Sequence, residues 1–206
     1  MWWFPKPALM KSRGRTGYTK GMVTPLLPVL QTPRLILRPM TVGDTEAVYR
    51  MISVSRDSFS RWFTWAREAN LDSVREYGRR MEEAMAVGME SHYVILTRAH
   101  SLVGRVGLME IDRVLRCAEL GYMLRTDFEG QGLMTEAVRT LAAHALGPGG
   151  LHRLAAYSDV DNFGSQRVLS RLGFRQEGML RHVARHPAHG WRDQYVYGLL
   201  EGELVG

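Results

Sequence analysis

The chain has 206 residues, 45% of them hydrophobic and 23% charged. These values exclude a disordered or fibrous protein and suffice for one sizeable core. The single cysteine, Cys117, excludes an intrachain disulfide framework and a cysteine-rich zinc site, and no run reaches the roughly 20 apolar residues that a membrane span needs, so the sequence predicts a cytoplasmic protein.

The formal net charge of +6 is concentrated at the N-terminus. Residues 1–30 contain five basic and no acidic residues, and subtracting these five charges leaves +1 for residues 31–206. We interpret residues 1–30 as a basic, flexible extension and residues 31–206 as a single domain. A basic arm can contact RNA or anionic lipid. The arm is rich in glycine, proline and threonine and lacks helical periodicity, which favours a solvated tail, so we predict neither a nucleic-acid nor a membrane partner.

The first half of the domain predicts one strand followed by three helices. Residues 34–38 form a short β-type run that Pro39 closes. Thr41, with Asp44 three residues later, predicts the N-cap of a helix. The aromatic segment Phe59–Trp65 predicts a packed helix, and the pair Ser73 and Glu76 predicts a capping box that opens the third helix.

The second half predicts three strands and then alternating helices and strands. The expected strands span residues 92–97, 102–111, 117–124, 154–158, 174 onward and 194–200, and the expected helices span residues 133–146 and 165–172. A short polar turn joins the first two of these strands and predicts an antiparallel hairpin. The order β-α-α-α-β-β-β-α-β-α-β-β is typical of a mixed α/β sheet with helices on its faces.

The segment Gly130-Gln131-Gly132 connects a predicted strand directly to a predicted amphipathic helix. Glycines let backbone N–H groups approach a ligand, and a helix N-terminus collects unpaired donors and positive dipole, which together can cradle a pyrophosphate. The Gly-Lys-Ser/Thr of a P-loop and the third glycine of a dinucleotide fold are missing. A plain strand–turn–helix corner remains the alternative.

Several spaced motifs over about residues 31–202 together resemble the GNAT acetyltransferases, and within them the RimJ/RimL-like branch. The motifs are Arg34-Leu35-Ile36-Leu37-Arg38, Glu119-Leu120-Gly121-Tyr122, Asn162-x-x-Ser165, Val168 to Phe174, and Trp191-Arg192-Asp193-x-Tyr195-x-Tyr197. The resemblance implies a central, twisted, mostly antiparallel sheet with helices on both faces. It also implies direct transfer of an acetyl group from acetyl-CoA to a primary amine in a ternary complex, without a metal.

The resemblance assigns the contacts to acetyl-CoA mainly to the backbone. The implied residues are Met123, Leu124 and Arg125 along the pantetheine, Gly130, Gln131, Gly132, Leu133, Met134 and Thr135 at the pyrophosphate, and Asn162 at the pantetheine arm. Asn162 is equally suited to capping the following helix. The chain departs from the family pattern at Glu129, where Arg or Gln is commoner, and at Met134, where Gly or Ala is commoner.

Catalysis requires an amine that has lost its proton. At pH 7 deprotonation costs about 4.6 kcal/mol for a lysine and about 1.4 kcal/mol for an α-amine. The resemblance places Glu119 at the position of the general base, with a structural or substrate-binding carboxylate as the alternative. It assigns Ser165 a hydrogen bond to the leaving sulfur, because Leu169 stands where many relatives have a tyrosine. An ordinary first-turn serine is the alternative.

Other reactive side chains carry weaker signals. His182, His186 and His189 lack a His-Glu-x-x-His pattern, and neighbouring proline and glycine predict a solvated loop rather than a metal site. Cys117 has no histidine in a recognisable nucleophile motif. The aromatic segment Phe59–Trp65 borders the acceptor site in the family, which leaves open a contact with the substrate.

The sequence does not single out one acceptor amine. A protein N-terminal α-amine of ribosomal type is the best family-level analogy. A small-molecule amine such as an aminoglycoside, polyamine or amino acid is the first alternative, and a catalytically silent acetyl-CoA-binding module is the second. A homodimer is left open.

Overall fold

The computed structural model describes residues 28–206, so nearly all of the basic extension predicted at residues 1–30 lies outside the described part. Eight strands form one sheet in the order β1-β2-β3-β4-β5-β6-β8-β7. The strands are β1 (Leu30–Gln31), β2 (Leu35–Pro39), β3 (Ser91–Thr97), β4 (Leu102–Asp112), β5 (Cys117–Leu124), β6 (Arg153–Asp159), β7 (Arg175–His186) and β8 (Gly190–Leu200). The α-helices are α1 (Thr45–Val54), α2 (Arg56–Ser60), α3 (Leu71–Ala86), α4 (Leu133–Leu146) and α5 (Phe163–Arg171). Within residues 28–206 no helix is long and apolar enough to cross a membrane.

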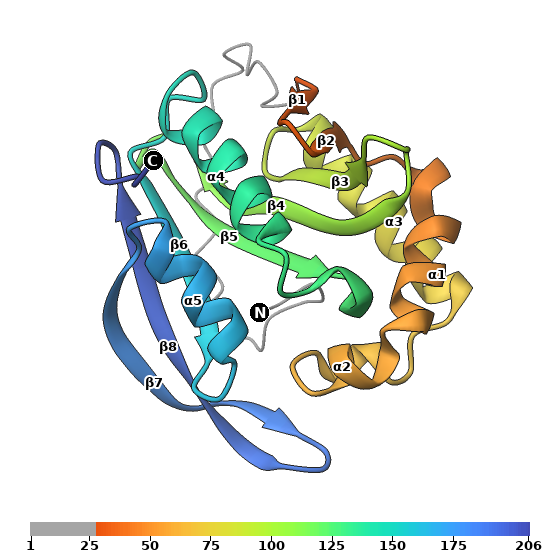
Figure 1. Cartoon of the computed structure of the whole chain (residues 1–206). Helices are drawn as coiled ribbons and strands as arrows, with labels where there is room; N and C mark the ends of the chain where they lie inside the picture. Colours follow the sequence, from red (N-terminus) through yellow and green to blue (C-terminus); the bar gives the residue numbers. More distant parts are fainter. Residues whose placement is uncertain (1–27) are drawn as a thin grey trace.

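The sheet is antiparallel at every neighbouring pair except β5 and β6, which run parallel. A parallel pair needs a crossover, and α4 supplies it on one face of the sheet (Figure 1). Pairing between β5 and β6 covers only three residue pairs and ends at Glu119 and Ala155. The C-terminal part of β5 therefore leaves β6, and on that side no strand of the described residues pairs with its backbone groups.

Two hydrophobic cores cover the two faces of the sheet. Leu120 and Tyr122 of β5 pack with α4 and α5, whereas Met123 packs with α1, α2 and α3. Successive residues of a strand point to opposite faces, so Glu119, Gly121 and Met123 share the face of the first three helices. Figure 1 shows α4 and α5 together on the near face of the sheet.

The predicted mixed α/β architecture is confirmed, and the strand Cys117–Leu124 and the helix Leu133–Leu146 have the predicted bounds. Three local predictions are wrong, and the first concerns the cap of the third helix. The third helix begins at Leu71, because Asn70 is its N-cap and Ser73 supplies the reciprocal side-chain bond, whereas Glu76 pairs with Arg79. A spacing of three residues in the sequence cannot by itself distinguish the N-cap residue from the residue that completes the capping box.

The second correction concerns the aromatic segment 59–65, which is not one helix. The helix α2 ends at Ser60 and a separate 3₁₀ turn, Thr64–Ala66, follows. The predicted packing does hold, since Phe59 and Phe63 are buried in the core under α1–α3 and their rings meet edge to face. Burial of the aromatic rings thus holds this segment against the core although it does not form one continuous helix.

The histidine-containing segment is also not a solvated loop. Strand β7 extends through His186 and β8 starts at Gly190, so His182 and His186 belong to a long hairpin. His186 is buried, and its Nε2 lies 2.7 Å from the carbonyl oxygen of Ser60 at the end of α2. Proline and glycine mark only the tip of this hairpin, which the tertiary structure anchors to α2.

Candidate active site

The turn before α4 exposes a row of backbone N–H groups. Gly130 and Gly132 both have φ of +75°, a conformation that favours glycine, and Gly132 is the N-cap of α4. Glu136 is the first residue of the helix whose N–H donates to a backbone carbonyl, that of Gly132. Within residues 28–206, none of the six N–H groups from Gly130 to Thr135 donates a hydrogen bond to the protein. Such a row at a helix N-terminus suits a pyrophosphate.

The side chains around this row leave its outer side open. Leu133 and Met134 are buried in the core under α4, so the methionine that departs from the family pattern does not cover the turn. Gln131 donates through Nε2 to the carbonyl of Asp127, at 3.3 Å. Glu129 is exposed, and partial desolvation raises the pKa of its carboxyl.

An interaction that the sequence did not assign holds this turn in place. Arg34, before β2, donates from Nε to the carboxylate of Glu136 at 2.6 Å and from a guanidinium nitrogen to the carbonyl of Gln131 at 2.9 Å. The hydroxyl of Thr32 donates to the same carboxylate. We call these contacts of Thr32 and Arg34 with Glu136 and Gln131 the clamp. Arg34 belongs to the Arg-Leu-x-Leu-Arg motif, but its role in the clamp follows only from the structure, which places β2 beside the start of α4.

Backbone groups of β5 line the gap that opens beside β6. The N–H of Arg125 donates to the carbonyl of Val103 at 2.7 Å and is therefore not available to a ligand. In an antiparallel pair, alternate residues point their N–H and C=O groups at the same neighbour. Met123 thus faces β4 as Arg125 does, whereas Tyr122 and Leu124 direct their backbone groups into the gap. Of the three residues predicted along the pantetheine, Leu124 is the one placed for backbone pairing there.

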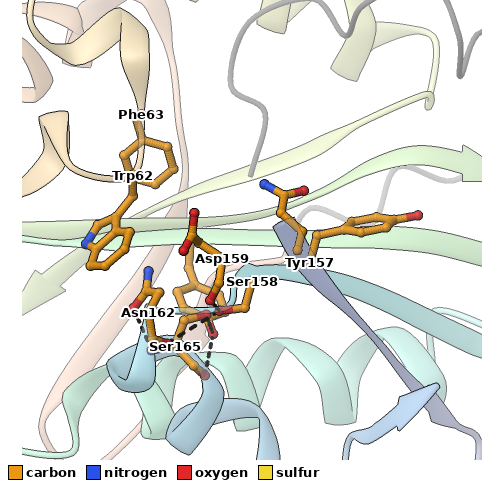
Figure 2. A pocket seen from close by; sticks show the side chains of 9 residues that line it. Trp62, Phe63, Tyr157, Ser158, Asp159, Asn162 and Ser165 are labelled. Atoms are coloured by element: carbon orange, nitrogen blue, oxygen red, sulfur yellow. Dashed lines mark hydrogen bonds between the residues drawn. The ribbon is translucent and has the colours of Figure 1, made fainter. Parts of the chain in front are cut away.

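A pocket lies at this gap, and residues from both faces of the sheet line it. It is lined by Trp62, Phe63, Tyr122, Tyr157, Ser158, Asp159, Asn162, Ser165 and Gln194. Figure 2 shows Asn162 and Ser165 at the start of α5 on one side, and Trp62 and Phe63 on the other. Because residues of both faces line the pocket, a donor bound on the α5 side would lie close to an acceptor bound on the side of α1–α3.

The predicted residues Asn162 and Ser165 meet in this pocket. Oδ1 of Asn162 accepts from the N–H of Ser165 at 3.0 Å, so Asn162 caps α5 as the alternative interpretation required. Oγ of Ser165 lies 2.9 Å from the hydroxyl oxygen of Tyr122, which also lies 3.3 Å from the Ser165 carbonyl. Burial raises the pKa of Tyr122, which therefore stays protonated at neutral pH.

Tyr122 was missed as a functional candidate, although it belongs to the motif Glu119-Leu120-Gly121-Tyr122. The position that many relatives reserve for tyrosine is Leu169 here, and that side chain is fully buried in the core. The phenol of Tyr122 reaches the same neighbourhood from β5 instead. Only the packing of β5 against α5 brings it to Ser165.

Glu119 lies where the pairing of β5 and β6 ends. Its residue is only 5% exposed, and it faces the side of α1–α3. It is not among the residues that line the pocket. A base at this position would act on an amine in the pocket through an intervening water.

Comparisons with known proteins agree with this geometry. The model of the acetyltransferase (GNAT) domain matches residues 34–175. The "Probable N-acetyltransferase YjcK" of Bacillus subtilis is 34% identical over 182 residues, which cover 84% of this chain and 97% of that protein.

Two solved structures share the fold at lower identity. The ribosomal L7/L12 α-N-protein acetyltransferase RimL in complex with coenzyme A superimposes with a TM-score of 0.78 at 21% identity, over 84% of this chain and 97% of that one. RimJ of Mycobacterium smegmatis with a coenzyme A disulfide gives 0.76 at 24%, over 84% of each chain. The row of open amides, the separation of β5 from β6 and the pocket between them fit these relatives. Because the family model matches more than half of the chain, this protein belongs to the GNAT family of N-acetyltransferases.

Proposed function

We propose that the protein transfers an acetyl group from acetyl-CoA to the N-terminal α-amine of a protein, by direct attack in a ternary complex. The observation that carries the proposal is the row of six N–H groups from Gly130 to Thr135 that meet no acceptor within residues 28–206, together with the pocket between β5 and β6. Acetyl-CoA supplies the thioester. The chain's own residues bind the two substrates and move the proton.

The donor side of the site is built from α4, α5 and β5. The amides of residues 130–135 bind the pyrophosphate, and the clamp from Arg34 to Glu136 keeps the turn in place. The backbone of Leu124 binds the pantetheine as an added strand would. Asn162 contributes through α5, whose first turn it caps.

Two residues handle charge during transfer. Glu119 takes the proton from the amine through water, which is a modest task for an α-amine because its pKa lies near 8. Ser165 donates a hydrogen bond to the sulfur as negative charge develops there. The hydroxyl of Tyr122 orients that of Ser165.

The charges on the acceptor side favour a singly charged amine. Among residues 28–206 the pocket is lined by one carboxylate, that of Asp159, and Arg192 donates to both of its oxygens, one of these bonds being 2.8 Å long. A polyamine carries several positive charges and needs several uncommitted carboxylates. Protein α-amines are also the acceptors named for RimL.

The test is a panel of amines with acetyl-CoA as the donor. Peptides with free N-termini, spermidine, an aminoglycoside and free amino acids are compared for release of coenzyme A, while calorimetry measures acetyl-CoA binding. We expect peptides to give the highest kcat/KM. Faster turnover of spermidine or of the aminoglycoside would assign the small-molecule acceptor, and binding without any turnover would assign the silent module.

Glu119→Gln tests the proposed base. We expect kcat/KM for a peptide at pH 7 to fall by about 100-fold or more, the usual effect of losing a general base, while the Kd for acetyl-CoA stays unchanged. Glu46→Gln, on the exposed side of α1, is the matched control. Unchanged turnover of the Glu119 variant would remove it as the base.

A further inference from the structure

We propose that Gln194 is the residue that receives the acceptor amine, through a hydrogen bond from the amine nitrogen to its side-chain oxygen. The inference rests on the proposed function and adds a specificity-determining residue to it. Gln194 lies on β8 opposite Asp159 of β6, and its side chain lines the pocket. It was not among the candidates found in the sequence.

The side-chain oxygen of Gln194 is the observation behind this proposal. The residue is 5% exposed, and within residues 28–206 no donor reaches Oε1. Buried polar atoms in proteins are nearly always hydrogen-bonded, and an unmet acceptor destabilises the fold. Because Gln194 lines the pocket, a turn of its terminal amide brings this buried oxygen to a donor that arrives with the substrate.

The surroundings define the chemistry of that donor. The neighbouring carboxylate of Asp159 is held by Arg192, which also pairs with Asp161 at 3.0 Å. The rings of Trp62 and Phe63 form the other wall and offer no anion. This lining fits a ligand that donates hydrogen bonds from its nitrogen and carries no other charge near the pocket. The N-terminus of a peptide whose first side chain is uncharged is such a ligand.

A neutral acceptor also suits the reaction. An amide oxygen accepts a hydrogen bond from the ammonium form of an amine and from the free amine alike. A carboxylate at this position would stabilise the ammonium form and raise the pKa of the amine, which delays the loss of the proton. Gln194 therefore positions the nitrogen without holding its proton.

Three variants test the assignment with the peptide Ser-Gly-Gly-Trp as the acceptor. In Gln194→Leu the new side chain is similar in size to glutamine but has no hydrogen-bond acceptor. The KM for the peptide should therefore rise about tenfold or more, which is the effect of losing one hydrogen bond to a charged group. The Kd for acetyl-CoA should stay unchanged, and the urea midpoint should stay equal or rise because the unmet oxygen is gone. Gln176→Leu, on the exposed strand β7, is the matched control.

Gln194→Glu distinguishes positioning from a merely structural role. It keeps an oxygen in place, so the KM for the peptide should stay within about threefold of the original. The pH at which kcat/KM rises should increase by about one pH unit, because the added carboxylate raises the pKa of the amine. An unchanged KM in Gln194→Leu, or a loss of acetyl-CoA binding there, would overturn the assignment while the proposed function stands.

Binding separates this inference from the proposed function. If the unmodified enzyme acetylates none of the amines, the peptide is titrated calorimetrically into the complex with coenzyme A. Binding that Gln194→Leu abolishes and Gln176→Leu retains would support the site even though the proposed function has failed. No binding to the unmodified complex would overturn both.

Discussion

At the scale of single residues, the site depends on hydroxyls and amides whose partners come from distant parts of the chain. In the proposed mechanism Ser165 alone is a weak hydrogen-bond donor to a leaving thiolate, but its Oγ lies 2.9 Å from the Tyr122 hydroxyl. When the phenol donates to Oγ, the serine proton is free to point at the sulfur. The pair is thus a positioning arrangement built by β5 and α5.

Tyr122→Phe is expected to lower kcat by about threefold to tenfold, the effect of one hydrogen bond of roughly 1 kcal/mol, with acetyl-CoA affinity unchanged. Steady-state kinetics of the single variants and of the double variant with Ser165→Ala measure the coupling. Because Tyr122 acts through Ser165, the double variant should be no slower than Ser165→Ala alone. Independent, additive losses would contradict the arrangement.

Gly132→Trp is expected to abolish acetyl-CoA binding, because the indole would cover the row of N–H groups at the start of α4. Gly132→Ala controls for the positive φ, since both variants are strained equally but only one is large. Titration calorimetry should give measurable binding for the alanine variant and none for the tryptophan variant. Equal affinities would mean that the pyrophosphate lies elsewhere.

At the scale of elements, the first strand region and α4 act as one unit. Thr32 and Arg34 approach Glu136 from the turn before β2, and Arg34 also binds the carbonyl of Gln131 within the glycine turn. Burial alone would raise the pKa of Glu136, but hydrogen bonds from Thr32 and Arg34 and the charge of Arg34 outweigh it and lower that pKa below 4.5. The ionised clamp therefore stabilises both the fold and the shape of the binding turn.

Glu136→Gln is expected to lower the free energy of unfolding at pH 7 by about 1 kcal/mol, since Arg34 is half exposed and solvent screens the pair. A lowered pKa contributes stability above 4.5, and this contribution is lost as the pH falls through the lower pKa of the folded state. Urea titrations of both proteins between pH 7 and pH 3 should show the difference shrinking toward the acid end. A constant difference would mean that the carboxylate charge has no part in the clamp, and Glu46→Gln serves as the surface control.

At the scale of the whole molecule, the sheet is parted and its two halves meet only partly. Strands β5 and β6 pair over three residues and then separate, and the pocket lies in the opening. One core packs under α4 and α5 and the other under α1–α3. A ligand in the opening contacts β5, α4 and α5 together and supplies the contacts that a continuous ladder would otherwise make.

Acetyl-CoA at 100 times its Kd is expected to stabilise the folded protein by about 2.7 kcal/mol. For a chain of this length that corresponds to an increase in Tm of roughly 5–10 °C. Thermal unfolding followed by circular dichroism measures the shift, with Gly132→Trp as the variant that should show none. An unchanged Tm for the unmodified protein would show that the native state does not bind the donor.

The sequence by itself determined the order of strands and helices from β2 onward and the glycine turn before α4, because periodicity, caps and glycine turns are local properties of the chain, but it did not predict β1. Asn162 and Ser165 were predicted from the family resemblance, and both line the pocket. Local spacing misplaced the cap of α3, since a cap and its partner look alike in sequence. It also took the distal part of the β7–β8 hairpin, around His182 and His186, for a loop, since His186 is fixed by Ser60, 126 residues away. The clamp of Arg34 on Glu136, the phenol of Tyr122 beside Ser165 and the unmet oxygen of Gln194 were decided by the tertiary structure alone. Each depends on which strands and helices become neighbours when the sheet parts between β5 and β6, and no pattern within one segment records that.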